Sequence, residues 1–348
     1  MLMVIFGAGA SHDSAQAFAA PDRPLSDQGG PWRPPLARDL FLDRNEWFGK
    51  VVREYADTLA PVLPYLRDQS GTKTVEEKLE ELQAQVTDYP QRKRQLYAVK
   101  FYLCHLMTEI TREWIDKTSR VTNYASLVDG LLRFNRDREP ILLVTFNYDL
   151  LLEDSLEGFG FNRNKSPDDY LESHDILKVL RLHGSIAWSR NVDTQGQLLQ
   201  PKELIARAEG LHPSDSFVSR NATTNFRSGR PNGSIVPAIA IPVQTKKESD
   251  FECPAAHREY LLKTLPNVTK ILIVGWQAKE AHFTDMLKGK LPELAHLMVV
   301  GKDKADSENV LNSFLRQIGK TNVPHTFYGE GGFTHFVVRQ EGEEFLRH

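Results

Sequence analysis

At 348 residues, the chain is long enough to bury a large hydrophobic core, either as one domain with an insertion or as two domains. Its 41% hydrophobic and 26% charged residues are ordinary for a globular protein. A formal net charge of −3 gives no electrostatic footprint for direct nucleic-acid binding, and no apolar stretch approaches the roughly 18–20 residues of a membrane span.

The N-terminus combines an apolar run with a glycine-rich turn, and a secretory signal is one interpretation of it. Such a signal begins with a positive segment, but no Lys or Arg precedes Arg23. Two glycines interrupt the apolar run, and His12 and Asp13 stand where it should continue. We therefore expect a cytoplasmic protein, in which Cys104 and Cys253 are reduced thiols.

The other interpretation is a phosphate-binding turn. Residues 1–6 are predicted to form a buried strand, because the run is short and rich in branched and aromatic side chains. Gly7 and Gly9 follow it, and they would let backbone N–H groups approach a diphosphate without interference from a Cβ. The third glycine of the dinucleotide fingerprint is missing, since position 12 is His. A tight strand-to-helix turn is the structural alternative.

Residues 19–38 hold five prolines and two glycines, which predicts an irregular loop. From residue 37 to about 135 apolar residues recur at helical intervals, and Thr74 and Glu77 have the spacing of a capping box. We expect a helical insertion over residues 37–135.

After Pro140 the pattern changes to short apolar runs of the kind found in parallel strands that are covered on both faces. Strands are predicted at 141–144, 177–180, 271–274 and 297–300. Helices are predicted at about 149–157, 279–289 and 306–318. Residues 210–235 are polar and rich in turn-forming residues, which predicts a mobile surface loop.

This alternation predicts an α/β fold: a doubly wound, mainly parallel Rossmann-like sheet with a large helical insertion after the first strand. The first strand then belongs with the C-terminal strands. The predicted domains are residues 1–36 plus 136–348 and the insertion at 37–135.

Polar residues follow the strand at 141–144. Asn147 and Asp149 stand two residues apart, just after Thr145, at the sheet edge where α/β proteins bind ligands. They could hold ribose hydroxyls and a carboxamide. An Asx turn or a helix N-cap is the structural alternative for both.

Two further motifs end predicted strands. His183, Gly184 and Ser185 follow the strand at 177–180, where a histidine can act as a base near neutral pH. Gly275 follows the strand at 271–274 and would open space beside a ribose or adenine. A structural histidine and a simple turn are the alternatives.

The order and identity of these motifs resemble the sirtuin family. Its Gly-Ala-Gly-x-Ser is matched at residues 7–11, its Thr-x-Asn-x-Asp at 145–149 and its Leu-His-Gly at 182–184, while Gly275 matches the glycine after its late strand. The resemblance covers residues 1–15 and 140–301.

The chain departs from protein-deacylating sirtuins, because two cysteines cannot build their four-cysteine zinc module and Trp276-Gln277 replaces their Thr-Ser. It is more similar to the sirtuin-like proteins of bacterial antiviral defence, which typically cleave NAD. Pro35-Leu36 and the segment 237–246 also resemble that group.

The resemblance implies an NAD hydrolase that releases nicotinamide and ADP-ribose, with NAD as substrate and no metal. Asn147, His183 and Asp149 would be catalytic. Contacts to NAD would come from Gly7, Ala8, Gly9, Ser11, Thr145, Gly184, Ser185 and Gly275.

Two other functions remain open: a sensor that binds NAD or ADP-ribose within a complex, and an NAD-dependent protein deacylase. The resemblance also implies a homo-oligomer, or a partner such as an ATPase or another defence protein.

Overall fold

The computed structural model describes residues 1–14, 33–42, 46–135, 138–220, 233–243 and 251–347. Its largest element is a parallel sheet of six strands in the order β3-β2-β1-β7-β8-β9. The strands are β1 (Leu2–Phe6), β2 (Ile141–Thr145), β3 (Leu177–Arg181), β7 (Lys270–Val274), β8 (His296–Val300) and β9 (His325–Tyr328). The predicted α/β class is confirmed, and so are the first five of these strands.

The central strands are built from branched aliphatic side chains because both faces of the sheet are covered. Val4 of β1 pairs with Leu143 on one side and Leu272 on the other, and all three are fully buried. The edge strand β9 was not predicted, because it is short and because His325 and Thr326 are exposed.

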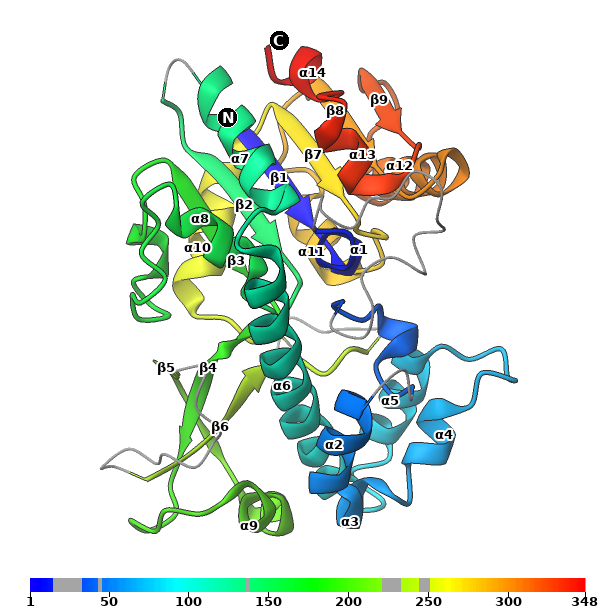
Figure 1. The fold of residues 1–348 in the computed structure, drawn as a ribbon, viewed down its shortest axis with the longest axis vertical. Coiled ribbons are helices and arrows are strands. Elements are labelled where there is room, and N and C mark those ends of the chain that lie inside the picture. The colour runs from blue at the N-terminus through cyan, green and yellow to red at the C-terminus, as the bar shows by residue number, and fades with distance from the viewer. Residues whose placement is uncertain (15–32, 43–45, 136–137, 221–232, 244–250, 348) are drawn as a thin grey trace.

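Helices cover the sheet, and α7 packs against α8, α13 and α14, while α11 packs against α12 (Figure 1). They are α1 (Ala8–His12), α7 (Asn123–Phe134), α8 (Leu151–Glu157), α10 (Ala255–Thr264), α11 (Ala281–Leu287), α12 (Lys304–Ile318), α13 (Gly332–Val338) and α14 (Glu343–Arg347). The three predicted helices after Pro140 correspond to α8, α11 and α12.

The helical segment after the first strand is also confirmed. It contains α2 (Glu46–Glu54), α3 (Ala56–Leu59), α4 (Leu63–Arg67), α5 (Val75–Ala84) and α6 (Gln91–Thr118). The predicted capping box begins α5: the Glu77 amide donates to Thr74 Oγ1 at 3.2 Å, and the Thr74 amide donates to the Glu77 carboxylate at 2.6 Å.

A second, antiparallel sheet has the order β5-β4-β6 and was not predicted. It consists of β4 (Gly184–Val192), β5 (Pro213–Ser219) and β6 (Ser234–Ile239), with α9 (Pro201–Ala206) between β4 and β5. The predicted loop at 210–235 is therefore wrong at residues 213–219, which form β5, and at residues 234–235, which begin β6. β5 is polar because it is a half-exposed edge strand. Residues 221–232 of that predicted loop, and 19–32 of the earlier one, lie outside the described residues.

Two hydrophobic cores organise the molecule. One surrounds the parallel sheet, and the other joins helices α2–α6 to the inner face of the antiparallel sheet. Helix α6 extends from one core to the other (Figure 1): Trp114 belongs to the first core, and Leu96 and Ile110 belong to the second. The predicted boundaries of the helical insertion, residues 37 and 135, stay a prediction. Each core contains residues from inside this range and residues from outside it.

Short 3-10 turns complete the described chain at Ala37–Asp39, Tyr170–Glu172, Ala208–Gly210 and Leu265–Asn267. Within the described residues, no helix is long and apolar enough to cross a membrane.

Candidate functional site

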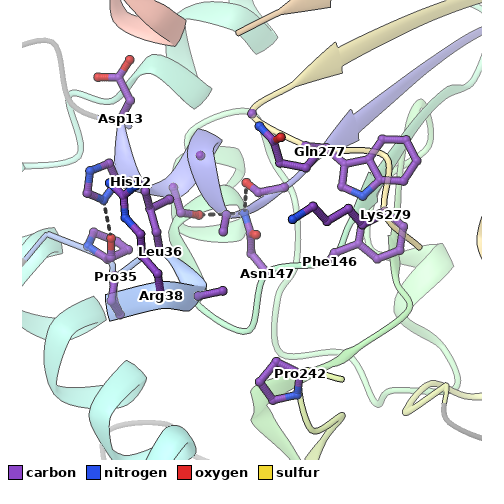
Figure 2. A pocket seen from close by; sticks show the side chains of 18 of the residues that line it. His12, Asp13, Pro35, Leu36, Arg38, Phe146, Asn147, Pro242, Gln277 and Lys279 are labelled. Atoms are coloured by element: carbon purple, nitrogen blue, oxygen red, sulfur yellow. Dashed lines mark hydrogen bonds between the residues drawn. The ribbon is translucent and has the colours of Figure 1, made fainter. Parts of the chain in front are cut away.

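The four predicted motifs follow strands that lie side by side in the parallel sheet. β1 lies between β2 and β7, and β3 lies beyond β2, so their carboxyl ends share one edge. The strand order reverses at β1, and open α/β sheets bind ligands at such a reversal. A pocket of about 690 Å³ lies there (Figure 2). The predicted site residues that line it are Gly7, Ala8, Gly9, Ser11, Asn147, Asp149, His183 and Gly275.

The glycine turn, which consists of Gly7, Ala8 and Gly9, is packed tightly against the end of β7. A Cβ on Gly9 would lie 2.9 Å from Gly275 Cα, and a Cβ on Gly275 would lie 2.2 Å from the Ala10 nitrogen. Gly275 also has φ +60°, in the left-handed region. These glycines therefore let two loops approach each other, which is the structural alternative for them, and they line the pocket as well.

Asn147 joins the loop after β2 to the glycine turn. Its Nδ2 donates to the Gly7 carbonyl oxygen and to Ser11 Oγ, both at 2.9 Å. The hydroxyl of Tyr124 on α7 lies 2.9 Å from Ser11 Oγ and completes a buried cluster. Since the amide nitrogen is committed to these bonds, Oδ1 is the group through which Asn147 can meet a ligand in the pocket.

Asp149 combines a structural role with a place in the pocket wall. Its Oδ1 accepts a hydrogen bond of 3.1 Å from the amide of Leu151, as the predicted Asx turn requires. The side chain is only 5% exposed. Burial raises the pKa of Asp149, and the nearby positive charge of Arg181 acts to lower it.

Arg181, at the end of β3, holds this corner of the site together and was not predicted as a site residue. Its Nη1 pairs with Glu153 of α8, and both side chains are buried. Its Nη2 donates to the carbonyls of Asn147 at 2.8 Å and Asp149 at 2.6 Å, and its Nε donates to that of Gly184 at 3.3 Å. A charged residue closing a buried apolar strand is the signal that could have revealed it, because buried arginines need partners.

His183 lies on the pocket wall beside aromatic side chains. Its ring centroid is 4.8 Å from that of Phe146, and Trp276 stacks on Phe146 at 5.4 Å with 17° between the planes. His183 is 3% exposed. The arrangement places an imidazole and an apolar surface in the same pocket, and the apolar surface can limit the entry of water.

Three predicted ligand contacts do not line the pocket. Thr145 Oγ1 accepts from the Asn147 amide at 3.1 Å, and Ser185 Oγ accepts from the Ala187 amide at 3.1 Å. Gly184 has φ +81°, and a Cβ there would lie 2.0 Å from the Ala238 oxygen. Their contacts therefore shape the two loops, and direct contact with a ligand stays a prediction for all three.

The segment after residue 32 closes one side of the pocket. His12 Nδ1 donates to the Pro34 carbonyl at 2.8 Å, and Arg33 lies 3.3 Å from Asp13. Asp13 also accepts from the amide of Thr334 at 2.9 Å. These bonds tie the end of α1 to α13 and to the segment that begins at Arg33.

The other wall comes from the second core. Arg38, Thr74, Glu76 and Met107 contribute from the helical segment, and Pro242 and Val243 follow β6. The pocket is thus shared between the two parts of the molecule. Among the described residues, no three His, Cys, Asp or Glu side chains form a group that could hold a metal, and the expected absence of a metal stays a prediction.

Comparisons with known proteins agree with the motifs. The family model of the SIR2-like domain matches residues 141–226, which include the loops of Asn147 and His183. No curated protein matches the chain.

Solved structures of Sir2 proteins are similar to the chain. A mutant Sir2 homologue in complex with 2′-O-acetyl ADP ribose is 13% identical, with a TM-score of 0.45, over 100% of this chain and 90% of that one. A Sir2 homologue–NAD complex is 12% identical, with a TM-score of 0.37, over 97% and 90%. The family model therefore carries the comparison: residues 141–226 of this chain match the SIR2-like domain.

Proposed function

We propose that the pocket binds NAD and that the chain hydrolyses its nicotinamide–ribose bond, giving nicotinamide and ADP-ribose. One observation carries the proposal: the glycine turn, Asn147, Asp149 and His183 line a single pocket at the strand-order reversal of a SIR2-like domain. A pocket of about 690 Å³ is within the range of small-molecule sites.

The reaction makes limited demands on the protein. The bond between C1′ of the ribose and the pyridinium nitrogen breaks, and its electron pair neutralises the departing nicotinamide. Water then bonds to C1′ through its oxygen and loses a proton. Because the leaving group is already cationic, no acid is needed, and the protein must stabilise an oxocarbenium-like state and position the water.

The lining residues offer groups for these tasks. Asn147 Oδ1 would orient the nicotinamide ribose or the water, and the Asp149 carboxyl would accept from the carboxamide NH₂. His183 would bind ribose hydroxyls or take the proton from water. Arg181 acts through the backbone of the Asn147–Asp149 loop and is a positioning residue.

The test is incubation of the purified chain with NAD, followed by chromatography of the products. Equal amounts of nicotinamide and ADP-ribose support a hydrolase. Binding without turnover would instead support the sensor. Nicotinamide release that requires an acyl-lysine peptide, with formation of an acylated ADP-ribose, would support the deacylase. A His183→Ala variant, tested for folding, controls for contaminating activity.

In the cell, we propose a role as an effector of bacterial antiphage defence, on the basis of the family resemblance alone. An enzyme that destroys NAD must be held inactive in its host, so we expect control through self-assembly or through a partner protein such as an ATPase. NAD levels in bacteria that express the chain, measured before and after phage infection, test this role. A loss of NAD that is the same with and without phage contradicts it.

A further inference from the structure

The glycine turn has few amide groups left for a ligand. The Gly7 amide donates to the Val274 carbonyl at 3.1 Å, and the Gly9 amide donates to the Gly275 carbonyl at 3.0 Å. Of the three residues of the turn, only the exposed Ala8 donates to no backbone carbonyl within the described ranges. Helix α1 has only five residues and adds little dipole. A diphosphate bound here therefore needs positive charge from elsewhere.

A lysine in the loop after β7 can supply that charge. Lys279 lines the pocket, and Figure 2 shows its side chain extended into the pocket with the ammonium pointing toward Asn147. In the part of the chain that the structure describes, the Lys279 ammonium has neither a hydrogen bond nor an ion pair.

The other Lys and Arg side chains that line the pocket have a carboxylate nearby. Arg33 lies 3.3 Å from Asp13, and Arg38 lies 3.7 Å from its neighbour Asp39. Lys302 lies 3.9 Å from Asp303. Among the described lining residues, Lys279 is therefore the basic side chain without a carboxylate partner.

We propose that Lys279 binds the diphosphate of the nucleotide and makes the pocket selective for phosphorylated ligands over nucleosides. The inference rests on the proposed function of the pocket as a nucleotide site. A lysine ammonium is a compact charge with three donors that suits phosphate oxygens. Since the diphosphate is unchanged when the nicotinamide leaves, Lys279 holds substrate and product equally. Its removal should raise KM and leave kcat nearly unchanged.

The decisive experiment is calorimetry with ADP-ribose and with adenosine on the wild-type chain, Lys279→Gln, Lys279→Arg and the control Lys304→Gln. Lys304 is exposed, carries the same charge and does not line the pocket. We expect Lys279→Gln to weaken ADP-ribose binding about tenfold or more, since a charged hydrogen bond is lost. Adenosine affinity should be unchanged, Lys279→Arg should recover most of the loss, and Lys304→Gln should match the wild type.

Three results would overturn the inference: unchanged ADP-ribose affinity in Lys279→Gln, equal weakening of both ligands, or a fall in kcat without a rise in KM. Binding is measured without turnover, so the two proposals can fail separately. If the wild type binds ADP-ribose through Lys279 but does not cleave NAD, the hydrolase is wrong and this inference stands. If the wild type binds neither ligand, both are wrong.

Discussion

Replacement of Asn147 by alanine separates two roles that the structure assigns to the same side chain. Its Nδ2 holds Gly7 and Ser11 through two bonds of 2.9 Å, while Oδ1 is available to the pocket. In Asn147→Ala, both acceptors keep another partner, because the Ala10 amide donates to the Gly7 carbonyl and Ser11 contacts the Tyr124 hydroxyl. The variant should therefore fold.

The expected loss of stability is small. At about 1 kcal/mol for each net hydrogen bond, the free energy of unfolding should fall by about 2 kcal/mol. For a chain of this size, that corresponds to a decrease in Tm of about 3 °C. Turnover of NAD should fall by about 10²-fold or more, if Oδ1 orients the reacting groups. Thermal unfolding and NAD turnover, both measured below the Tm of the variant, give the two numbers.

Tyr124→Phe is the matched control. It removes a hydroxyl from the same buried cluster, but Tyr124 does not line the pocket. We expect a comparable loss of stability and turnover within about threefold of the wild type, which is less than 1 kcal/mol in the barrier. If Asn147→Ala keeps turnover within the same range, Asn147 only joins the loops. If Tyr124→Phe loses as much turnover as Asn147→Ala, the geometry of the cluster explains both losses.

Further predictions concern charge, metal and assembly. Because burial raises the pKa of Asp149, its protonated form is favoured in the folded chain, and wild-type stability falls as pH rises through that pKa. Asp149→Asn should therefore gain stability relative to the wild type at pH 7 and lose that advantage below about pH 4, and an equal Tm difference at both pH values would contradict this. Arg181→Met removes the ion-pair partner of the buried Glu153, which among the described residues keeps only the Tyr170 hydroxyl, and should cost about 3–5 kcal/mol in urea unfolding. The double variant with Glu153→Gln should recover part of that loss. No recovery would mean that the ion pair is not the cause. NAD turnover should survive EDTA, and bound zinc near one per chain with unfolding on chelation would refute this. Turnover per chain should rise with concentration as light scattering detects assembly, whereas a fully active monomer would exclude control by self-assembly.

Local patterns in the sequence were enough to predict much of this fold. Short branched runs marked five strands of the parallel sheet, and helical periodicity with the Thr74–Glu77 capping box marked the segment after the first strand. The same strands placed Gly7, Asn147, His183 and Gly275 at one sheet edge, because parallel strands present their carboxyl ends together. These features depend on residues close together in the chain.

Only the tertiary structure decided the rest, because the deciding contacts join distant segments. The polar edge strand β5 is stabilised by pairing with β4, which its own sequence does not indicate. Arg181 meets Glu153 across 28 positions, and Asn147 meets Gly7 across 140. Lys279 is one exposed lysine among many in the sequence, and its significance comes from a pocket that three distant segments build around it. Sequence periodicity reports which face of an element is buried, whereas the partner of a buried polar group depends on how the elements pack.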